Sequence, residues 1–375
     1  MLSQRASGIK PSGIRRIFEL VSSMEDPINL SIGQAHFDVP EVIKQAAIAA
    51  IQDGHNRYTI TQGLPELNER VVARLSERYG FEGTGEQSVI TSGVSGGLML
   101  GFMALLDPGD HVLLPDPYFV MYGVLAELVS ADWGTYDLYP GAPLTEAALE
   151  AGVNERTKLL LINSPSNPTG RTLTPEELDA VGAVAERHNL TVVSDEIYED
   201  FVYDRPHASA VGHVPAERLL QLGGFSKTWA MPGWRMGWAV GPEKLIDAMR
   251  LMQQFSFVCA PSMAQYACLK AFDVDMSSYI ADYKAKRDRL VEGLGESYEV
   301  SPPGGSFYLF PRLPKGAEGS AAFMEKAVER ELLLVPGSAF SARDTHFRLS
   351  FAATDEVLER GVVALRELAE ELAGT

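Results

Sequence analysis

One lysine stands among residues that could lower its pKa and hold an anion beside it. Lys227 follows Ser226 in the sequence GGFSKTWAMPGWRMGW (223–238), and Arg235 comes eight positions later. Apolar surroundings disfavour a charged lysine, which makes its amine a usable nucleophile. With a phosphate held by Ser226 and Arg235, such a lysine could carry pyridoxal 5'-phosphate (PLP) as a Schiff base. A lysine in a surface loop is the alternative, so companions elsewhere in the chain must decide.

A glycine-rich turn is predicted at TSGVSGG (91–97), where an apolar run gives way to a helical pattern. The first N–H groups of a helix are unpaired and lie at the positive end of its dipole, so this turn could bind a phosphate. Glycines also serve ordinary tight turns, which is the alternative here. A nucleotide-binding phosphate loop is excluded at 91–97 and at Lys227, because neither stretch has the GxxxxGK[ST] order.

Two more apolar runs end in polar residues that could contact a cofactor ring. Asn167, in NSPSNPTG (163–170), could donate from its amide to a phenolate oxygen, although the stretch also has the composition of a plain turn. Asp195 could pair with a protonated pyridine nitrogen, and Tyr198 could reach the ring oxygen. Acidic residues after a strand also hold magnesium in ATPases, but no phosphate loop accompanies these.

Short apolar runs alternate with helical periods from Ser88 to Val240, and a capping box of Thr174 and Glu177 begins one predicted helix. This alternation predicts an α/β fold with a mostly parallel sheet covered by helices on both faces. The C-terminal ends of the strands should line the site. The predicted strands are Ser88–Thr91, His111–Leu114, Lys158–Ile162, Thr191–Ser194, Leu219–Leu222 and Met236–Val240, and the predicted helices include Glu41–Asp53, Pro65–Tyr79 and Pro175–His188.

The pattern changes beyond about Tyr279 and predicts a smaller α+β domain built from both ends of the chain. Residues 45–280 are predicted to form a large PLP-binding domain, and residues 1–44 and 281–375 the small domain. An arm followed by a short helix is predicted over Ile9–Asp26. The expected C-terminal elements are helices at Tyr279–Leu294, Ala321–Glu331 and from Asp355, and strands at Ser306–Phe310, Leu332–Val335 and Phe347–Phe351.

The composition limits the class of protein. The 375 residues, 46% of them hydrophobic, are enough for two domains. A net charge of −18 argues against nucleic acid or an anionic membrane surface as a partner. The apolar stretch Ser88–Leu106 contains several glycines and is predicted to be a strand and a helix, not a membrane span. Two cysteines, histidines without ligand spacing and no visible signal peptide predict a cytoplasmic protein without a metal.

Together and in this order, these motifs resemble the class I/II aminotransferases, the PLP-dependent fold type I family that includes aspartate aminotransferase. The resemblance runs from about Ser12 to Ala353. It implies that Lys227 carries the cofactor and that Asp195 pairs with the pyridine nitrogen. The further contacts that it implies are Asn167 and Tyr198 to the ring hydroxyl, Phe119 stacked on the ring, and Ser226, Arg235 and the backbone of Val94 and Ser95 to the phosphate.

The same resemblance implies where the substrate binds and how two subunits pair. Arg348, in the sequence FRLSFA (347–352), matches the arginine that binds the substrate α-carboxylate. Gly33 matches a loop whose backbone meets that carboxylate, with Asn167 also in contact with the substrate. Tyr58 matches a tyrosine that reaches the phosphate of the neighbouring subunit, which implies a homodimer with composite active sites.

The implied activity is transfer of the amino group of an L-amino acid to a 2-oxo acid by ping-pong kinetics. Lys227 would be both the Schiff-base lysine and the proton carrier, and Tyr198 would assist at the ring. A β-elimination lyase or decarboxylase would use the same Lys227 and Asp195, since a fold alone does not fix a reaction. A regulatory domain that binds PLP without turnover is the remoter alternative.

Neutral or aromatic amino acids are expected to be better donors than aspartate. Some aspartate-specific relatives place a lysine at about Ser95, where this chain has no cation. A second carboxylate would then lose water without gaining a partner, unless a protonated His36 supplies the charge. The residues expected to make the pocket apolar are Ile14, Ile17 and Phe18 of the N-terminal arm, together with Tyr118 and Tyr122.

Overall fold

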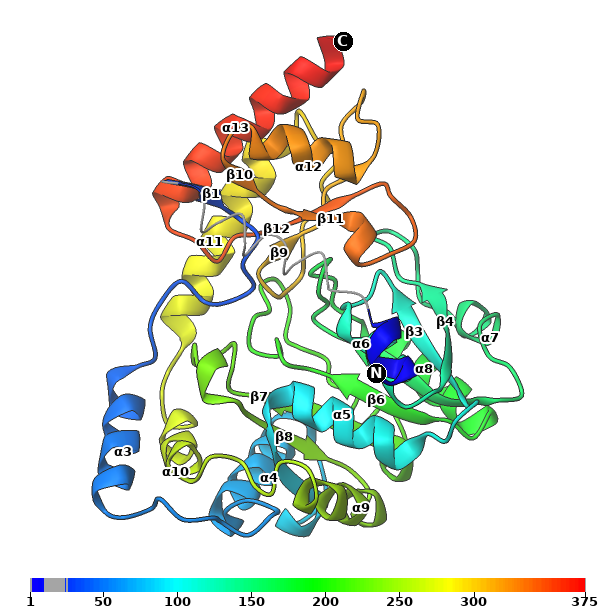
Figure 1. The fold of residues 1–375 in the computed structure, drawn as a ribbon, viewed down its shortest axis with the longest axis vertical. Helices are drawn as coiled ribbons and strands as arrows, with labels where there is room; N and C mark the ends of the chain where they lie inside the picture. Colours follow the sequence, from blue (N-terminus) through cyan, green and yellow to red (C-terminus); the bar gives the residue numbers. More distant parts are fainter. Residues whose placement is uncertain (1, 10–23, 25, 375) are drawn as a thin grey trace.

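The structure is a computed structural model that describes residues 2–9, 24 and 26–374. A seven-stranded sheet forms its centre, with the strand order β2-β8-β7-β6-β5-β3-β4 (Figure 1). Neighbouring strands are parallel except for β8, which runs antiparallel to β2 and to β7. The strands are β2 (Ser88–Ser92), β3 (His111–Asp116), β4 (Asp132–Asp137), β5 (Thr157–Asn163), β6 (Thr191–Asp195), β7 (Leu219–Gly224) and β8 (Met236–Val240).

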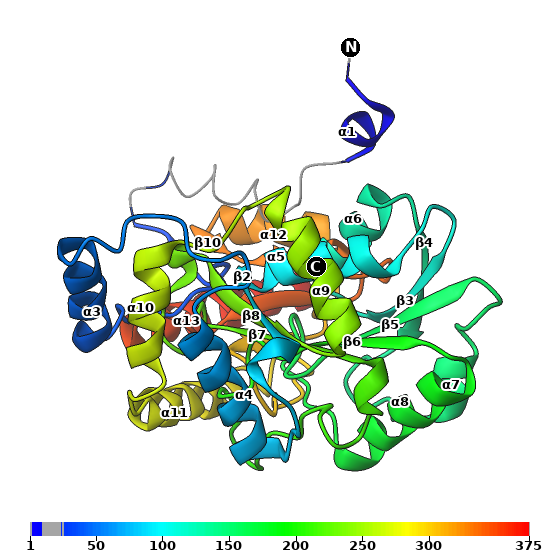
Figure 2. The ribbon, with the colours of Figure 1, turned by 90° about the horizontal axis from the view of Figure 1, so that it is seen from below.

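Helices cover both faces of this sheet because its inner strands are apolar on both sides. On β5, Leu159 and Leu161 belong to one hydrophobic cluster, and Leu160 and Ile162 belong to another. The first cluster includes side chains of α5, α6 and α9, and the second those of α4, α7, α8 and α10 (Figure 2). These helices are α4 (Pro65–Tyr79), α5 (Gly93–Leu105), α6 (Met121–Leu128), α7 (Glu146–Glu150), α8 (Pro175–Arg187), α9 (Glu243–Gln254) and α10 (Ser262–Ala271).

Two small sheets lie at the other end of the long helix α11 (Figure 1). In one, β1 pairs in parallel with β10, which joins the N-terminal part of the chain to the C-terminal part. In the other, β12 lies between β11 and β9 and is antiparallel to both. The remaining elements are α1 (Gln4–Gly8), β1 (Ile28–Asn29), α3 (Glu41–Gln52), α11 (Ser277–Leu294), β9 (Tyr308–Leu309), α12 (Ser320–Val328), β10 (Leu332–Leu333), β11 (Val335–Pro336), β12 (Phe347–Ser350) and α13 (Asp355–Gly374).

The predicted mostly parallel α/β architecture is confirmed, and several predicted bounds are met. Helix α4 and strand β8 have the predicted limits, and Ser88–Leu106 forms β2 followed directly by α5. The predicted capping box at Thr174 is present, since its side chain accepts from the N–H of Glu177 and the Glu177 side chain accepts in return. Within the described residues, no helix is both long and apolar enough to cross a membrane.

Other predicted elements are wrong or incomplete. Strand β4 was not predicted, and the predicted strand at Leu332–Val335 divides into β10 and β11, which belong to different sheets. The predicted strand at Ser306–Phe310 shortens to β9, and the predicted helix at Ala321–Glu331 ends at Val328. Most of the predicted arm lies outside the described residues. The predicted domain limits fall inside α3 and α11, and the division into two domains stays a prediction.

Candidate active site

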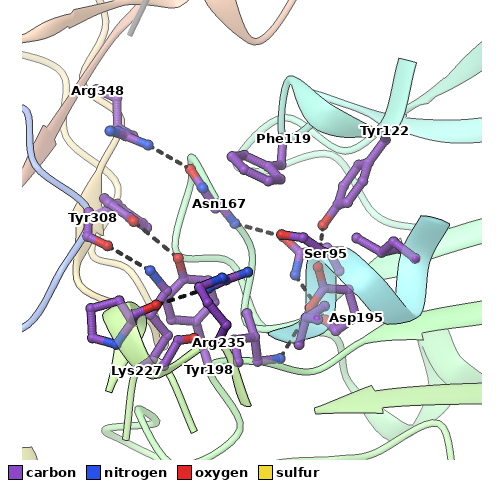
Figure 3. A pocket seen from close by; sticks show the side chains of 17 residues that line it. Ser95, Phe119, Tyr122, Asn167, Asp195, Tyr198, Lys227, Arg235, Tyr308 and Arg348 are labelled. Atoms are coloured by element: carbon purple, nitrogen blue, oxygen red, sulfur yellow. Dashed lines mark hydrogen bonds between the residues drawn. The ribbon is translucent and has the colours of Figure 1, made fainter. Parts of the chain in front are cut away.

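A cavity of about 240 Å³ lies where β5, β6 and β7 end at their C-termini, beside the N-terminus of α5 (Figure 3). Residues of β9 and β12 close it from the side of the small sheets. Every predicted site residue except Tyr58 lines this cavity. The lining residues are Gly33, Val94, Ser95, Leu98, Phe119, Tyr122, Asn163, Asn167, Asp195, Ile197, Tyr198, Ser226, Lys227, Pro232, Arg235, Tyr308 and Arg348.

Lys227 follows β7 and extends its side chain into the cavity. Its Nζ atom donates to the carbonyl oxygen of Gly33 at 2.6 Å and lies 5.8 Å from the ring centroid of Tyr198. Burial lowers the pKa of Lys227 to about 8, and the positive charge of Arg348 adds to this effect. An appreciable fraction of the amine is therefore neutral near physiological pH, as a nucleophile requires.

Asp195 is the last residue of β6 and is buried at the floor of the cavity. Its Oδ2 atom accepts from the hydroxyl of Tyr122 at 2.8 Å, and its Oδ1 atom accepts from the N–H of Ile197 at 3.2 Å. Burial raises the pKa of Asp195 to about 6, although both hydrogen bonds oppose the rise. At neutral pH, Asp195 is therefore mostly ionised and would be stabilised by a cation in the cavity.

Arg348 reaches the cavity from β12 and is 2% exposed. Its guanidinium donates to Asn167 Oδ1 at 3.0 Å and to the carbonyl oxygen of Ser31 at 2.8 Å. The guanidinium carbon lies 4.4 Å from the ring centroid of Tyr308 and 5.0 Å from that of Phe340, so two aromatic rings hold it. Among the residues that the structure describes, its buried Nε–H group has no hydrogen-bond partner. The side chain is thus fixed in place with one donor unused.

Arg235 lies against the start of α5, which is the predicted phosphate site. Its guanidinium donates to the carbonyl oxygen of Ser92 at 3.3 Å. Gly93 has a φ of +67°, and a Cβ atom there would lie 2.6 Å from Arg235 Nη2. Only glycine therefore lets the guanidinium approach the first helical turn, next to Val94 and Ser95. A cation beside unpaired helix N–H groups can bind an anion.

The structure adds two tyrosines that were not predicted as site residues. Tyr122 was predicted only as an apolar wall, but it donates to Asp195. Tyr308 lies with its hydroxyl 3.0 Å from that of Tyr198 and with its ring against Arg348. Tyr308 is 110 residues from Tyr198 in the sequence, and no local motif marks the contact.

The described lining of the cavity carries more positive than negative side chains. Lys227, Arg235 and Arg348 all line it, and within the described ranges none of them forms an ion pair with a carboxylate. Asp195 is the single acid among the described lining residues. The cavity is therefore built for a ligand that carries several negative charges and one group able to pair with Asp195.

Other residues with a predicted role lie outside the cavity. The Tyr58 side chain is 83% exposed in the single chain. Tyr118 does not line the cavity, which corrects the prediction, because its ring packs edge-to-face on Trp133 with centroids 5.4 Å apart. His36 Nε2 lies 2.8 Å from Lys286 Nζ, and burial together with this cation lowers the pKa of His36. Ile14, Ile17 and Phe18 are outside the described residues.

Comparison with known proteins identifies the family. The sequence model of aminotransferase class I and II matches residues 25–365. The chain belongs to this family. It is 36% identical to a probable aspartate aminotransferase of Methanocaldococcus jannaschii, over 99% of this chain and 100% of that protein. It is 33% identical to aromatic-amino-acid aminotransferase 2 of Thermococcus litoralis, over 99% of this chain and 98% of that protein.

Solved structures agree with the family assignment. A double mutant of the Thermus thermophilus aspartate aminotransferase superposes with a TM-score of 0.92 at 32% identity, over 98% of this chain and 99% of that one. The protein is thus a PLP-dependent transaminase of fold type I, as predicted. The cavity fits this cofactor, because it combines a partly neutral amine, a buried carboxylate and unpaired cations.

Proposed function

We propose that this aminotransferase moves the amino group of an L-amino acid to a 2-oxo acid in two half-reactions, with Lys227 as the reacting amine. Bound PLP supplies an electron sink for the carbanion at the substrate Cα. Lys227 Nζ would attach the cofactor covalently until the substrate amine takes its place. The freed amine would then serve as general base and acid for the Cα proton.

The residues around Lys227 have complementary roles in this proposal. Asp195 would hold a proton on the pyridine nitrogen, because a buried carboxylate with two hydrogen bonds stabilises an adjacent cation. Tyr198 and the amide of Asn167 would bond the ring hydroxyl oxygen, and Phe119 would pack on the ring face. Asn167 uses its carbonyl oxygen for Arg348, which leaves its NH₂ group to donate.

The observation that supports the proposal best is the unused bonding capacity of the three cations. Arg235, Ser226 and the backbone of Val94 and Ser95 would bind the phosphate. Arg348 would bind the substrate α-carboxylate, since its guanidinium is held rigidly and its Nε–H has no partner. The loop at Gly33 passes beside Lys227 and would contact the same carboxylate.

Borohydride reduction tests the central assignment. Reduction of the yellow, PLP-loaded protein should fix the cofactor to Lys227, and peptide mass spectrometry should find the added mass on that residue. The Lys227→Ala protein should bind PLP only reversibly and keep no label after denaturation. Label on any other lysine of the wild-type protein would overturn the assignment.

We further propose that neutral or aromatic amino acids are better donors than aspartate. The cations that line the cavity are already assigned to the cofactor or to the α-carboxylate, and Val94, Leu98, Ile197 and the aromatic residues form much of the wall. We do not expect His36 to supply the missing charge, because burial and the cation of Lys286 lower its pKa and it does not line the cavity. Relatives carry both aspartate and aromatic names, so the two classes must be compared directly.

The comparison requires kcat/KM for aspartate, phenylalanine, tyrosine, alanine and methionine, with 2-oxoglutarate as acceptor. We expect the apolar donors to exceed aspartate, because burial of apolar surface contributes about 25 cal/mol per Å². Aspartate ahead of all four would show that a cation not yet identified lines the substrate side-chain pocket, and would overturn the proposed preference.

We also propose a homodimer with composite sites. Several large apolar side chains are exposed in the single chain, including Tyr58 at 83%, Phe255 at 81% and Ile60 at 58%. Exposed apolar groups of this size commonly mark a protein interface. The two-domain division, the cytoplasmic location and the absence of a nucleic-acid partner rest on the sequence alone.

A further inference from the structure

Helix α4 holds the chain segment that follows β6. Arg74 donates from Nη2 to both carboxylate oxygens of Asp200, at 2.8 and 2.7 Å, and from Nε to Glu199 at 2.9 Å. Arg78, one turn later, donates to Asp200 at 2.7 Å. Tyr79 donates to the second oxygen of Glu199 at 2.9 Å. The planar guanidinium of Arg74 thus binds two neighbouring carboxylates at once, through Nε and Nη2, and these charge-assisted bonds hold both acids in place.

Asp200 also binds the chain segment that follows β7, through a hydrogen bond from Thr228. The hydroxyl of Thr228 donates to Asp200 Oδ2 at 2.9 Å, and Thr228 is 4% exposed. Burial favours the neutral acid, but Arg74 and Arg78 outweigh it and hold the pKa of Asp200 below its ordinary value. Thr228 therefore donates to an ionised acceptor, and such hydrogen bonds are roughly twice as strong as neutral ones.

Contacts with aromatic rings also connect α4 to the segment that follows β7. The guanidinium carbon of Arg74 lies 5.5 Å from the ring centroid of Trp229, the residue after Thr228. The Trp229 ring also packs on Phe225, with centroids 5.1 Å apart. Phe225, Thr228 and Trp229 are thus held in the protein interior, while Ser226 and Lys227 between them line the cavity.

We propose that Thr228 is a positioning residue for Lys227, held through Asp200 by Arg74 and Arg78 of α4. Asp200 lies five residues after Asp195, so one carboxylate connects the segment that bears Asp195 and Tyr198 to the segment that bears Ser226 and Lys227. The contact fixes the Lys227 backbone relative to Asp195. This inference rests on the proposed role of Lys227.

The geometry explains why one hydroxyl should matter. A lysine side chain has many rotamers, so the position of Nζ depends on how firmly its backbone is held. A β-branched threonine has a stiff χ1, and its hydrogen bond therefore restrains the backbone beside it. Proton transfer at the substrate Cα requires the amine within hydrogen-bond reach, and displacements on the order of 1 Å can cost a hundredfold in rate.

The test compares Thr228→Val, which removes the hydroxyl at nearly constant shape, with Thr228→Ser, which keeps it. On the PLP-loaded proteins we would measure the pH midpoint of the visible absorbance change, the dissociation constant for PLP, and kcat and KM. Thr172→Val is the control, because it removes a threonine hydroxyl that accepts from Arg205 at 2.9 Å away from the cavity. Borohydride labelling of Lys227 in the wild-type protein is checked first, so that failure of the proposed function is recognised separately.

We expect Thr228→Val to lower kcat on the order of tenfold with KM changed less than about twofold, to move the absorbance midpoint and to weaken PLP binding. Thr228→Ser should recover most of each loss, and Thr172→Val should behave like the wild type. If Thr228→Val does not fold, Arg74→Lys, which keeps the charge but cannot bond Glu199 and Asp200 through two separate nitrogen atoms, should move the same midpoint.

The inference is overturned if Thr228→Val keeps the wild-type midpoint and kcat. It is equally overturned if Thr228→Ser is as impaired as Thr228→Val, or if Thr172→Val shifts the midpoint to the same extent. A fall in melting temperature with unchanged midpoint and kcat would assign the whole cluster to fold stability alone.

Discussion

At the level of single residues, the proposed role of Asp195 depends directly on its negative charge. We expect Asp195→Asn to lower turnover on the order of a hundredfold or more, because an amide cannot hold the proton on the cofactor nitrogen. PLP binding should largely survive, since the phosphate contacts are untouched. Steady-state kcat and a PLP binding isotherm would measure both quantities.

The control for this substitution is Asp132→Asn, at an exposed carboxylate that pairs with Arg156 at 2.6 Å. It should leave turnover unchanged. Tyr122→Phe should have an intermediate effect, because it removes one of the hydrogen bonds that Asp195 accepts. Near-normal turnover of Asp195→Asn would exclude the proposed ion pair with the ring nitrogen.

Lys227 should make the stability of the cofactor-free protein depend on pH. Its pKa is about 8 in the folded protein and 10.5 in an ordinary setting, so folding disfavours the protonated amine. Between these values the unfolded chain binds more protons than the folded one, and the free energy of unfolding should rise with pH, by up to about 1.4 kcal/mol per pH unit. Below pH 8 the folded protein keeps the full free-energy cost of burying the protonated Lys227 amine.

Urea unfolding of cofactor-free protein across this range measures the effect, with Lys227→Met as the reference. The difference in unfolding free energy between the two proteins should shrink as the pH rises through the window. A constant difference would mean that the folded and unfolded states bind this proton equally.

At the level of elements, the junction of β2 and α5 depends on the backbone of Gly93. An alanine at Gly93 would meet two penalties, the left-handed φ of +67° and a Cβ only 2.6 Å from Arg235 Nη2. Gly109 has a φ of +89° but open space around it, so Gly109→Ala meets the first penalty alone. The left-handed backbone should cost each variant about 1–2 kcal/mol of stability.

Only Gly93→Ala should also weaken PLP binding, on the order of tenfold, because it displaces the guanidinium from the predicted phosphate site. Fluorescence titration with PLP and denaturant unfolding separate the two effects. Equal PLP affinities in the two variants would contradict the phosphate role of Arg235.

The elements that could be predicted from the sequence are those with a strong local pattern. The alternating clusters on β5 and the amphipathic α4 are visible in the residue order alone. Strand β4 was missed because only one of its six residues, Tyr136, is buried and its sequence, DWGTYD, lacks an apolar run. The division of Leu332–Val335 into β10 and β11 depends on partners far away in the chain, β1 and β12, which periodicity does not report.

The same holds for the candidate site: some of its residues could be predicted from local sequence, and others depend on tertiary contacts. Lys227, Asp195 and Asn167 each follow an apolar strand, so their positions at one sheet edge could be predicted. The contacts of Tyr308 with Tyr198 and of Thr228 with Asp200 join segments by tertiary packing. No spacing in the sequence marks either contact.

For the whole molecule, the proposed dimer predicts complementation between two defective subunits. Tyr58→Phe and Lys227→Ala should each be strongly impaired as homodimers. A mixed dimer contains one site with an intact Lys227 and a partner Tyr58, so random pairing of equal amounts should restore about a quarter of the wild-type sites. Activity after mixing and subunit exchange measures the recovery.

Native mass spectrometry with one isotopically labelled subunit would confirm that exchange has occurred. Exchange without any recovery would show that Tyr58 does not complete the partner's site. A fully active monomer would contradict the composite site altogether.

The positive cavity has a consequence for how fast the enzyme captures its ligands. The chain carries 32 basic and 50 acidic residues, so an anion at long range is repelled by a net charge of −18. The attraction of Lys227, Arg235 and Arg348 is felt only near the mouth, because screening limits it to about 8 Å at physiological ionic strength. Added salt should therefore first speed association of a dicarboxylic 2-oxo acid, by weakening the outer repulsion, and slow it only once the inner attraction is screened as well.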